Sequence, residues 1–217
     1  MKRNPLNTNH HIHGEPTYEG YEIQLKHGLV VREYLDKTFK NMQRALDEHG
    51  RVCMIRVDLH VPNNCHPIAK NSNQLMSKFI ASLRAKIKHS QNQSIKEGNR
   101  VHNTEVRFLW CREVSSFGGV HYHVVLLLNH DAYRSIGKFD LESDNMYSRI
   151  HEAWGSALGM HPVDLLGLIH IPINPTYCIC RNDFQSFQNA FYRASYLCKM
   201  ETKDYEQGLH SFGGSRI

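Results

Sequence analysis

Two histidines one residue apart have the clearest potential for chemistry in this sequence. His121-Tyr122-His123 opens a strongly apolar, strand-like segment. Side chains of a strand alternate between its two faces, so both imidazoles share one face and Tyr122 lies on the other. Two imidazoles held this way could bind a metal ion. Two hydrogen-bonded histidines on a polar sheet face are the alternative interpretation.

Glu113 could complete a metal site with this pair. A loop containing Gly118 and Gly119 separates it from His121. If the flanking strands form a hairpin centred on Phe117, Glu113 lies opposite His121 on the same face. Two imidazoles and one carboxylate leave coordination positions open, which suits Mn²⁺ or Mg²⁺. In the alternative, Glu113 is a solvated charge at a strand end, and a register slip of one residue would turn it away.

Asp58 and His60 are further candidates on a neighbouring predicted strand. They alternate with apolar residues, so both lie on its polar face. We expect them either to support the metal ligands through hydrogen bonds or to form a plain solvated strand face.

A third group lies on the last predicted helix. Tyr192, Tyr196 and Lys199 are spaced by four and then three residues, which places them on one helix side. A hydroxyl and an ammonium could then reach the same point. Tyrosines on an amphipathic helix are also common at the edge of a core, with the hydroxyl in water.

The elements that must position these residues follow from hydrophobic periodicity. After a first helix the order is β, α, β, β, α, β, α. This is the split-βαβ order, so we predict an α+β fold with a ferredoxin-like (RRM-like) antiparallel sheet. Helices pack on one face of the sheet, with additional N-terminal and C-terminal helices. The predicted helices are 25–49, 72–88, 140–158 and 183–200, and the predicted strands are 51–61, 105–113, 121–129 and 165–173.

The length of 217 residues suits one domain with a helical addition. We predict a flexible N-terminal tail over 1–24, a helical appendage over 25–49 and the main domain over 50–217. No apolar run is long enough to span a membrane, and the first residues lack a signal-peptide core. Six scattered cysteines are interpreted as reduced thiols. We therefore expect a cytoplasmic protein of a bacterial host, of phage or prophage origin.

Charge is unevenly distributed along the chain. Residues 1–104 hold 16 basic and nine acidic residues, and the remainder holds ten and 12. Lys78, Arg84, Lys86 and Lys88 cluster in the second predicted helix, where they could contact a phosphate backbone. A solvated helix face is the alternative.

Glu113, the His121-Tyr122-His123 motif and the Tyr196-Leu-Cys-Lys199 motif, in that order, resemble the HUH endonucleases, whose name abbreviates His-hydrophobic-His. The Glu-to-His spacing and the Tyr-x-x-Lys pattern are similar to the rolling-circle replication initiators. Further phrases resemble the YagK/YfjJ C-terminal-domain and inovirus-type replication proteins; they are Arg56-Val-Asp-Leu59, Trp110-Cys-Arg-Glu113 and Phe212-Gly-Gly-Ser-Arg216. The resemblance covers about residues 50–217.

The resemblance implies a divalent metal on His121 and His123 and a tyrosine nucleophile, for which Tyr196 matches the motif. Such a tyrosine cleaves single-stranded or hairpin DNA at an origin, leaving a 5′-phosphotyrosine and a free 3′-OH. Tyr192 could serve a second cleavage. The sequence has no P-loop motif, so a host helicase and a host polymerase would be partners.

Two other functions stay open from sequence. A catalytically inactive HUH descendant could act only as a DNA-binding prophage regulator. An RRM-like RNA-binding protein would need aromatic residues on the open sheet face, whereas Arg56, Asp58 and the histidines are expected there.

Overall fold

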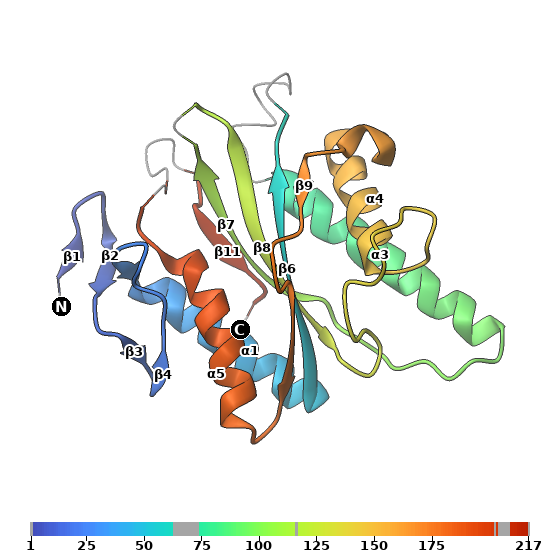
Figure 1. Cartoon of the computed structure of the whole chain (residues 1–217), viewed down its shortest axis with the longest axis horizontal. Helices are drawn as coiled ribbons and strands as arrows, with labels where there is room; N and C mark the ends of the chain where they lie inside the picture. The colour runs from blue at the N-terminus through green and yellow to red at the C-terminus, as the bar shows by residue number, and fades with distance from the viewer. Residues whose placement is uncertain (1, 63–73, 116, 202, 204–208, 217) are drawn as a thin grey trace.

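The structure, a computed structural model, describes the whole chain except residues 1, 63–73, 116, 202, 204–208 and 217. Its centre is an antiparallel sheet of six strands in the order β10-β6-β8-β7-β11, with β9 also paired to β6. The predicted mixed α+β fold with an antiparallel sheet is confirmed (Figure 1). The strands are β6 (Arg51–His60), β7 (Arg107–Val114), β8 (Val120–Asn129), β9 (Ile169–His170), β10 (Thr176–Cys180) and β11 (Phe212–Gly214).

Helices cover both faces of this sheet, so the prediction that they pack on one face is wrong; the central strands present apolar side chains to both sides. On one face, α3 (Gln74–Lys96) and α4 (Met146–Leu158) bury Phe79 and Trp154 against Tyr122. On the other face lie α1 (Arg32–His49) and α5 (Phe184–Ser195), as Figure 1 shows. Both faces of β6 and β8 are therefore buried over most of their length, as in other sheets covered on two sides.

The N-terminal segment differs from the predicted tail and appendage. Strands β1 (Arg3–Asn4) and β2 (Asn7–His13) form a small sheet with β5 (Val30–Val31), and β3 (Thr17–Tyr18) pairs with β4 (Tyr21–Glu22). Tyr18 and Ile23 are buried in the same core as α1 and α5. Residues 2–24 thus contribute short strands and two buried side chains to this core. Helix α1 packs directly on the sheet and is part of that core.

Helix ends account for most other differences. The first helix begins at Arg32 rather than 25, because Gly28 takes a left-handed turn with φ of 90° and β5 follows. Helix α3 continues beyond the predicted end at 88 to Lys96. Helix α4 begins after Asn145, whose side chain accepts from the Ser148 amide in a capping box.

The end of the chain holds the largest error in the predicted elements. The predicted strand over 165–173 reduces to the two residues of β9, preceded by a 3-10 turn, η1 (Pro162–Leu165). The loop after it contains strand β10, which pairs with β6 along its full length. Helix α5 ends at Ser195 and continues as a 3-10 turn, η2 (Tyr196–Cys198). Tyr196 therefore sits at a helix end rather than in a continuous helix.

Among the helices of the described part of the chain, none is long and apolar enough to cross a membrane.

Candidate metal and tyrosine site

One face of the sheet changes from apolar to polar along its strands, and this change creates the site. Near α1 and α5 this face presents Met54, Leu109 and Val125 to the core. Alternation continues the same face into Asp58 on β6, Glu113 on β7 and His123 on β8. Polar side chains at this end of three adjacent strands leave a hydrophilic region beside the apolar core.

The predicted strand register is confirmed. Glu113 lies directly opposite His121, and β8 lies between β6 and β7. On the other side of β8, His121 faces His60 and His123 faces Asp58. The pairing of β8 with its two neighbours therefore brings five side chains together: Asp58, His60, Glu113, His121 and His123.

Glu113, His121 and His123 form a group suited to a metal ion. Their potential ligand atoms lie within 4.8 Å of one another. Glu113 Oε2 is 3.4 Å from His123 Nε2 and 3.7 Å from His121 Nε2. In the described part of the chain, the buried His123 Nε2 has no hydrogen-bond partner. A buried ring nitrogen of this kind, next to a second imidazole and a carboxylate, fits a divalent ion.

Asp58 supports this group from behind. Its Oδ1 lies 2.6 Å from His123 Nδ1, an arrangement in which Nδ1 donates and Nε2 keeps its lone pair for the site. Burial alone would raise the pKa of Asp58. The hydrogen bond from His123 and the charge of the nearby Arg56 instead lower this pKa to about 2. The carboxylate is therefore ionised whenever the protein is near neutral pH.

His60 lies on the outer side of the group. Its ring stacks on His121, with 5.4 Å between the ring centroids. Burial and the neighbouring His121 lower the pKa of His60. A neutral His60 can pack against His121 without adding positive charge beside a cation site.

Two lysines hold the Glu113 carboxylate, and sequence reasoning identified only one of them. Lys199 Nζ is 3.0 Å from Oε2, and Lys203 Nζ is 3.1 Å from Oε1. Burial would raise the pKa of Glu113, but the adjacent His121 and His123 rings and the charge of Lys203 lower it well below its usual range. The side chain of Lys203 is fully buried. No spacing rule indicated it, because the helix that would relate it to Lys199 has already ended.

Tyr196 is connected to the same carboxylate through Lys199. The Lys199 ammonium donates to the Tyr196 hydroxyl at 2.8 Å and lies 4.3 Å from the ring centroid. The Arg56 guanidinium lies 4.4 Å from that centroid, and the His123 ring meets it edge-on at 5.2 Å. Cations around the phenol favour binding of an anionic substrate group beside it. The sequence analysis gave Arg56 no role at the tyrosine.

Tyr192, the other candidate, lies one turn earlier on α5. Its side chain is 40% exposed. Its main-chain carbonyl accepts hydrogen bonds from Gln24 Nε2 and Ser195 Oγ, each at 2.8 Å. These contacts tie the N-terminal segment to α5. A second cleavage by Tyr192 stays a prediction.

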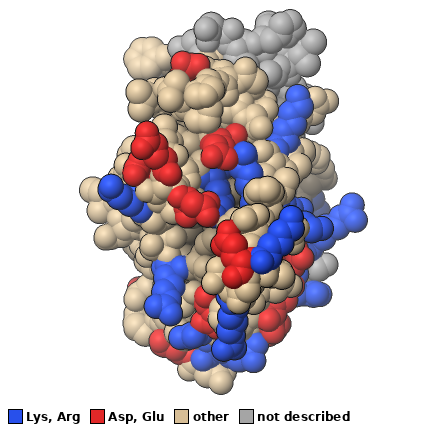
Figure 2. Space-filling model, turned by 90° about the vertical axis from the view of Figure 1, so that its right-hand side faces the viewer, with Lys and Arg blue, Asp and Glu red and all other residues tan. Residues whose placement is uncertain are grey.

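The basic residues predicted to contact DNA lie elsewhere. Lys78, Arg84, Lys86 and Lys88 are on α3, on the sheet face opposite the site. Figure 2 shows basic and acidic side chains mixed over this side of the molecule. Lys86 pairs with Glu152 at 2.7 Å, and Arg84 donates to the Val106 carbonyl. The structure does not bring these four residues together with Tyr196.

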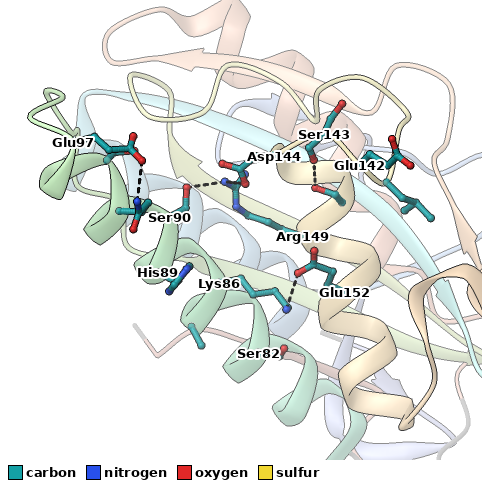
Figure 3. Close-up of a pocket in the computed structure, with 15 residues that line it drawn as sticks. Ser82, Lys86, His89, Ser90, Glu97, Glu142, Ser143, Asp144, Arg149 and Glu152 are labelled. Carbon is teal, nitrogen blue, oxygen red and sulfur yellow. Dashed lines mark hydrogen bonds and ion pairs between the residues drawn. The ribbon is translucent and has the colours of Figure 1, made fainter.

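The hollow between α3 and α4 shows the same balance of charge. Arg149 reaches across it to Ser90 at 2.7 Å and is also bound by Asp144, as Figure 3 shows. Lys86 and Glu152 bridge the two helices beside it. Its basic groups are thus already paired within the protein.

Comparison with known proteins gives the family. The YagK/YfjJ C-terminal domain matches residues 13–215. This chain belongs to the YagK/YfjJ C-terminal domain family. YagK of Escherichia coli strain K12 is 34% identical, covering 93% of this chain and 98% of its own length. YfjJ of the same strain is 32% identical, covering 87% of this chain and 96% of its own length. No solved structure matches the chain.

The extent of the family match agrees with the structure. The YagK/YfjJ domain match includes α1 and the strands β3, β4 and β5, which pack with α5 in one core. The names of the two relatives, both given as uncharacterized proteins, state no activity.

Proposed function

We propose that this protein is a metal-dependent nickase that cleaves and rejoins single-stranded DNA through a covalent 5′-phosphotyrosine at Tyr196. The proposed role is to initiate rolling-circle replication of a phage, prophage or plasmid, as the HUH endonucleases do. The substrate is a single-stranded or hairpin DNA origin. Mn²⁺ or Mg²⁺ is the proposed metal.

One set of contacts carries the proposal. Tyr196 accepts from Lys199, Lys199 also contacts Glu113, and Glu113 lies within 3.7 Å of both imidazoles. The phenol and the candidate metal ligands are thus joined through one ammonium. A nucleophile beside a cation site is the arrangement that phosphoryl transfer requires. Residues from three strands and the end of α5 meet at this point. A sheet end that was polar only because it faces water would not require them to converge.

The arrangement of the elements supports the same proposal. Strands β6, β7, β8 and β10 form the spatial order β10-β6-β8-β7, and α3 and α4 provide the two crossovers. This order supports the proposed ferredoxin-like, split-βαβ fold. The HUH resemblance implies such a sheet, and β8, which carries both histidines, lies between β6 and β7.

The chain's residues can perform the proposed chemistry as follows. The Tyr196 oxygen attacks the phosphorus of a phosphodiester, and the bond from phosphorus to the 3′ oxygen breaks. The phenolic proton is given up and the leaving oxygen gains one, so the products are a 5′-phosphotyrosine and a free 3′-OH. Lys199 and Arg56 stabilise negative charge on the phenol and on the phosphate. A bound metal would neutralise charge on the scissile phosphate.

Rejoining is the reverse attack by a 3′-OH, so no nucleotide cofactor is needed. The sequence holds no P-loop motif, and duplex unwinding and synthesis are assigned to a host helicase and polymerase. Of the four basic residues predicted to contact DNA, Lys78 and Lys88 are proposed to bind phosphates away from the cleavage point, whereas Arg84 and Lys86 would have to give up their contacts with Val106 and Glu152.

Incubation with Mn²⁺ and circular single-stranded DNA tests the proposal. We expect a protein–DNA adduct that survives a denaturing gel, and its loss in Tyr196→Phe. Tyr192→Phe is the matched control, because it removes the same oxygen one helical turn away. Binding without any adduct in the wild type would favour a DNA-binding regulator over a nickase.

A further inference from the structure

We propose that a divalent metal ion and the Lys199 ammonium exchange at a single oxygen of Glu113, so that Lys199 is left to Tyr196 when the metal binds. The inference rests on the metal centre of the proposed function but not on DNA cleavage. It makes Lys199 the element that couples metal occupancy to the tyrosine.

The two oxygens of Glu113 have different neighbours. Oε1 lies 3.1 Å from Lys203 Nζ and 3.6 Å from the Cys111 thiol. Oε2 lies 3.4 Å from His123 Nε2 and 3.7 Å from His121 Nε2. Oε2 is therefore the oxygen that approaches both imidazoles. That same oxygen is the one that Lys199 contacts, at 3.0 Å.

An ammonium and a divalent cation cannot both occupy this oxygen comfortably. Glu113 is 2% exposed, so water screens their repulsion poorly. One of the two cations must withdraw, and Lys199 has a second partner to keep. Its ammonium already donates to the Tyr196 hydroxyl at 2.8 Å. Lys203 is on the other oxygen and its side chain is fully buried, so it stays in place.

The exchange has a chemical consequence. Without metal, the Lys199 ammonium contacts both the Glu113 carboxylate and the Tyr196 hydroxyl. With metal bound, the ammonium acts on the phenol oxygen alone, where it favours attack. Metal binding therefore shifts the population toward the arrangement in which Lys199 contacts only the phenol. This dependence would prevent the tyrosine from being activated in a site that cannot neutralise the phosphate.

Calorimetric titration with Mn²⁺ tests the exchange without any DNA. We compare the wild type with Lys199→Met and Lys203→Met. The two ammoniums lie at nearly equal distances from the same carboxylate. Each variant therefore removes one positive charge at about the same distance from the metal site. We expect Lys199→Met to bind Mn²⁺ about tenfold more tightly than the wild type, because one charged hydrogen bond no longer competes. Lys203→Met should show a clearly smaller gain or a loss.

Three results contradict the inference, and they are distinguishable. Equal tightening in both variants means general charge repulsion and no exchange. A larger gain in Mn²⁺ affinity for Lys203→Met means that the ion competes with Lys203 at Oε1 rather than with Lys199 at Oε2. If neither the wild type nor the variants bind Mn²⁺, the metal centre of the proposed function fails as well.

A measurement on the wild type covers the case in which a variant does not fold. The ¹⁵N signals of lysine ammoniums are followed in ¹⁵N-lysine protein as diamagnetic Mg²⁺ is added. We expect the Lys199 signal to move at saturation and the Lys203 signal to move much less. An unmoved Lys199 signal, while the histidine rings respond to Mg²⁺, overturns the exchange.

Discussion

The protein has two groups of basic residues that differ in nearly every respect. On α3 the basic side chains are dense along the sequence, largely exposed, and balanced by surface acids such as Glu152. Around Glu113 there are two lysines with side chains at most 9% exposed, and both contact one carboxylate. The first group is conspicuous in the sequence, and the second is hardly visible there. A run of basic residues along the sequence indicates an exposed charged surface. Buried lysines that contact one carboxylate indicate a candidate functional site.

The largest expected effect is on the free energy of unfolding, when the acidic partner of each basic group is removed. Glu113→Gln leaves two buried ammoniums without their counter-ion, so we expect a loss of about 3–5 kcal/mol in the free energy of unfolding. Glu152→Gln breaks the Lys86 pair on the exposed side and should cost at most about 1 kcal/mol. Urea denaturation measures both. Similar losses in the two variants would contradict the distinction between the groups.

A smaller effect should appear in acid. The pKa of Asp58 falls from 3.8 to about 2 in the folded protein. A depressed carboxyl pKa stabilises the fold above the unfolded pKa, and this stability is lost as pH falls through the folded value. We expect Asp58 to contribute about 2 kcal/mol at neutral pH, lost between about pH 4 and 2. Asp58→Asn should flatten that part of the stability curve. An unchanged acid limb would show that Asp58 is not held by His123.

The smallest effects should come from the α3 group. Neutralising Lys78 and Lys88 should weaken binding to unrelated DNA sequences alike and lower the slope of log affinity against log salt by about one per lysine. Because these residues lie across the sheet from Tyr196, adduct formation at saturating DNA should not change. Fluorescence anisotropy over a salt series measures the slope. An unchanged slope would place the DNA on another surface.

The site was partly predictable from sequence for clear physical reasons. Alternation put His121 and His123 on one face, and the hairpin arithmetic put Glu113 opposite His121, as the observed register confirms. Lys203 and the position of Arg56 over Tyr196 depend on how the chain turns after α5, which no local spacing encodes.

The fold shows the same limit. The long strands β6 and β8 have clear patterns, and their existence was predicted well. The N-terminal strands are two to seven residues long and mostly polar, so their order depends on the core formed by α1 and α5. Strand β10, with two cysteines and an edge position, likewise depends on pairing with β6. Tertiary contacts decide such short elements.

The most direct test of the central claim is to find the residue that carries DNA after cleavage. Trypsin cuts after Arg181, Arg193 and Lys199, so Tyr192 and Tyr196 fall in separate peptides, 182–193 and 194–199. The protein is reacted with Mn²⁺ and single-stranded DNA, treated with nuclease and trypsin, and analysed by mass spectrometry. We predict a nucleotide phosphate on Tyr196 in peptide 194–199. A nucleotide only on peptide 182–193, or on neither peptide, would contradict the assignment of Tyr196 as the nucleophile.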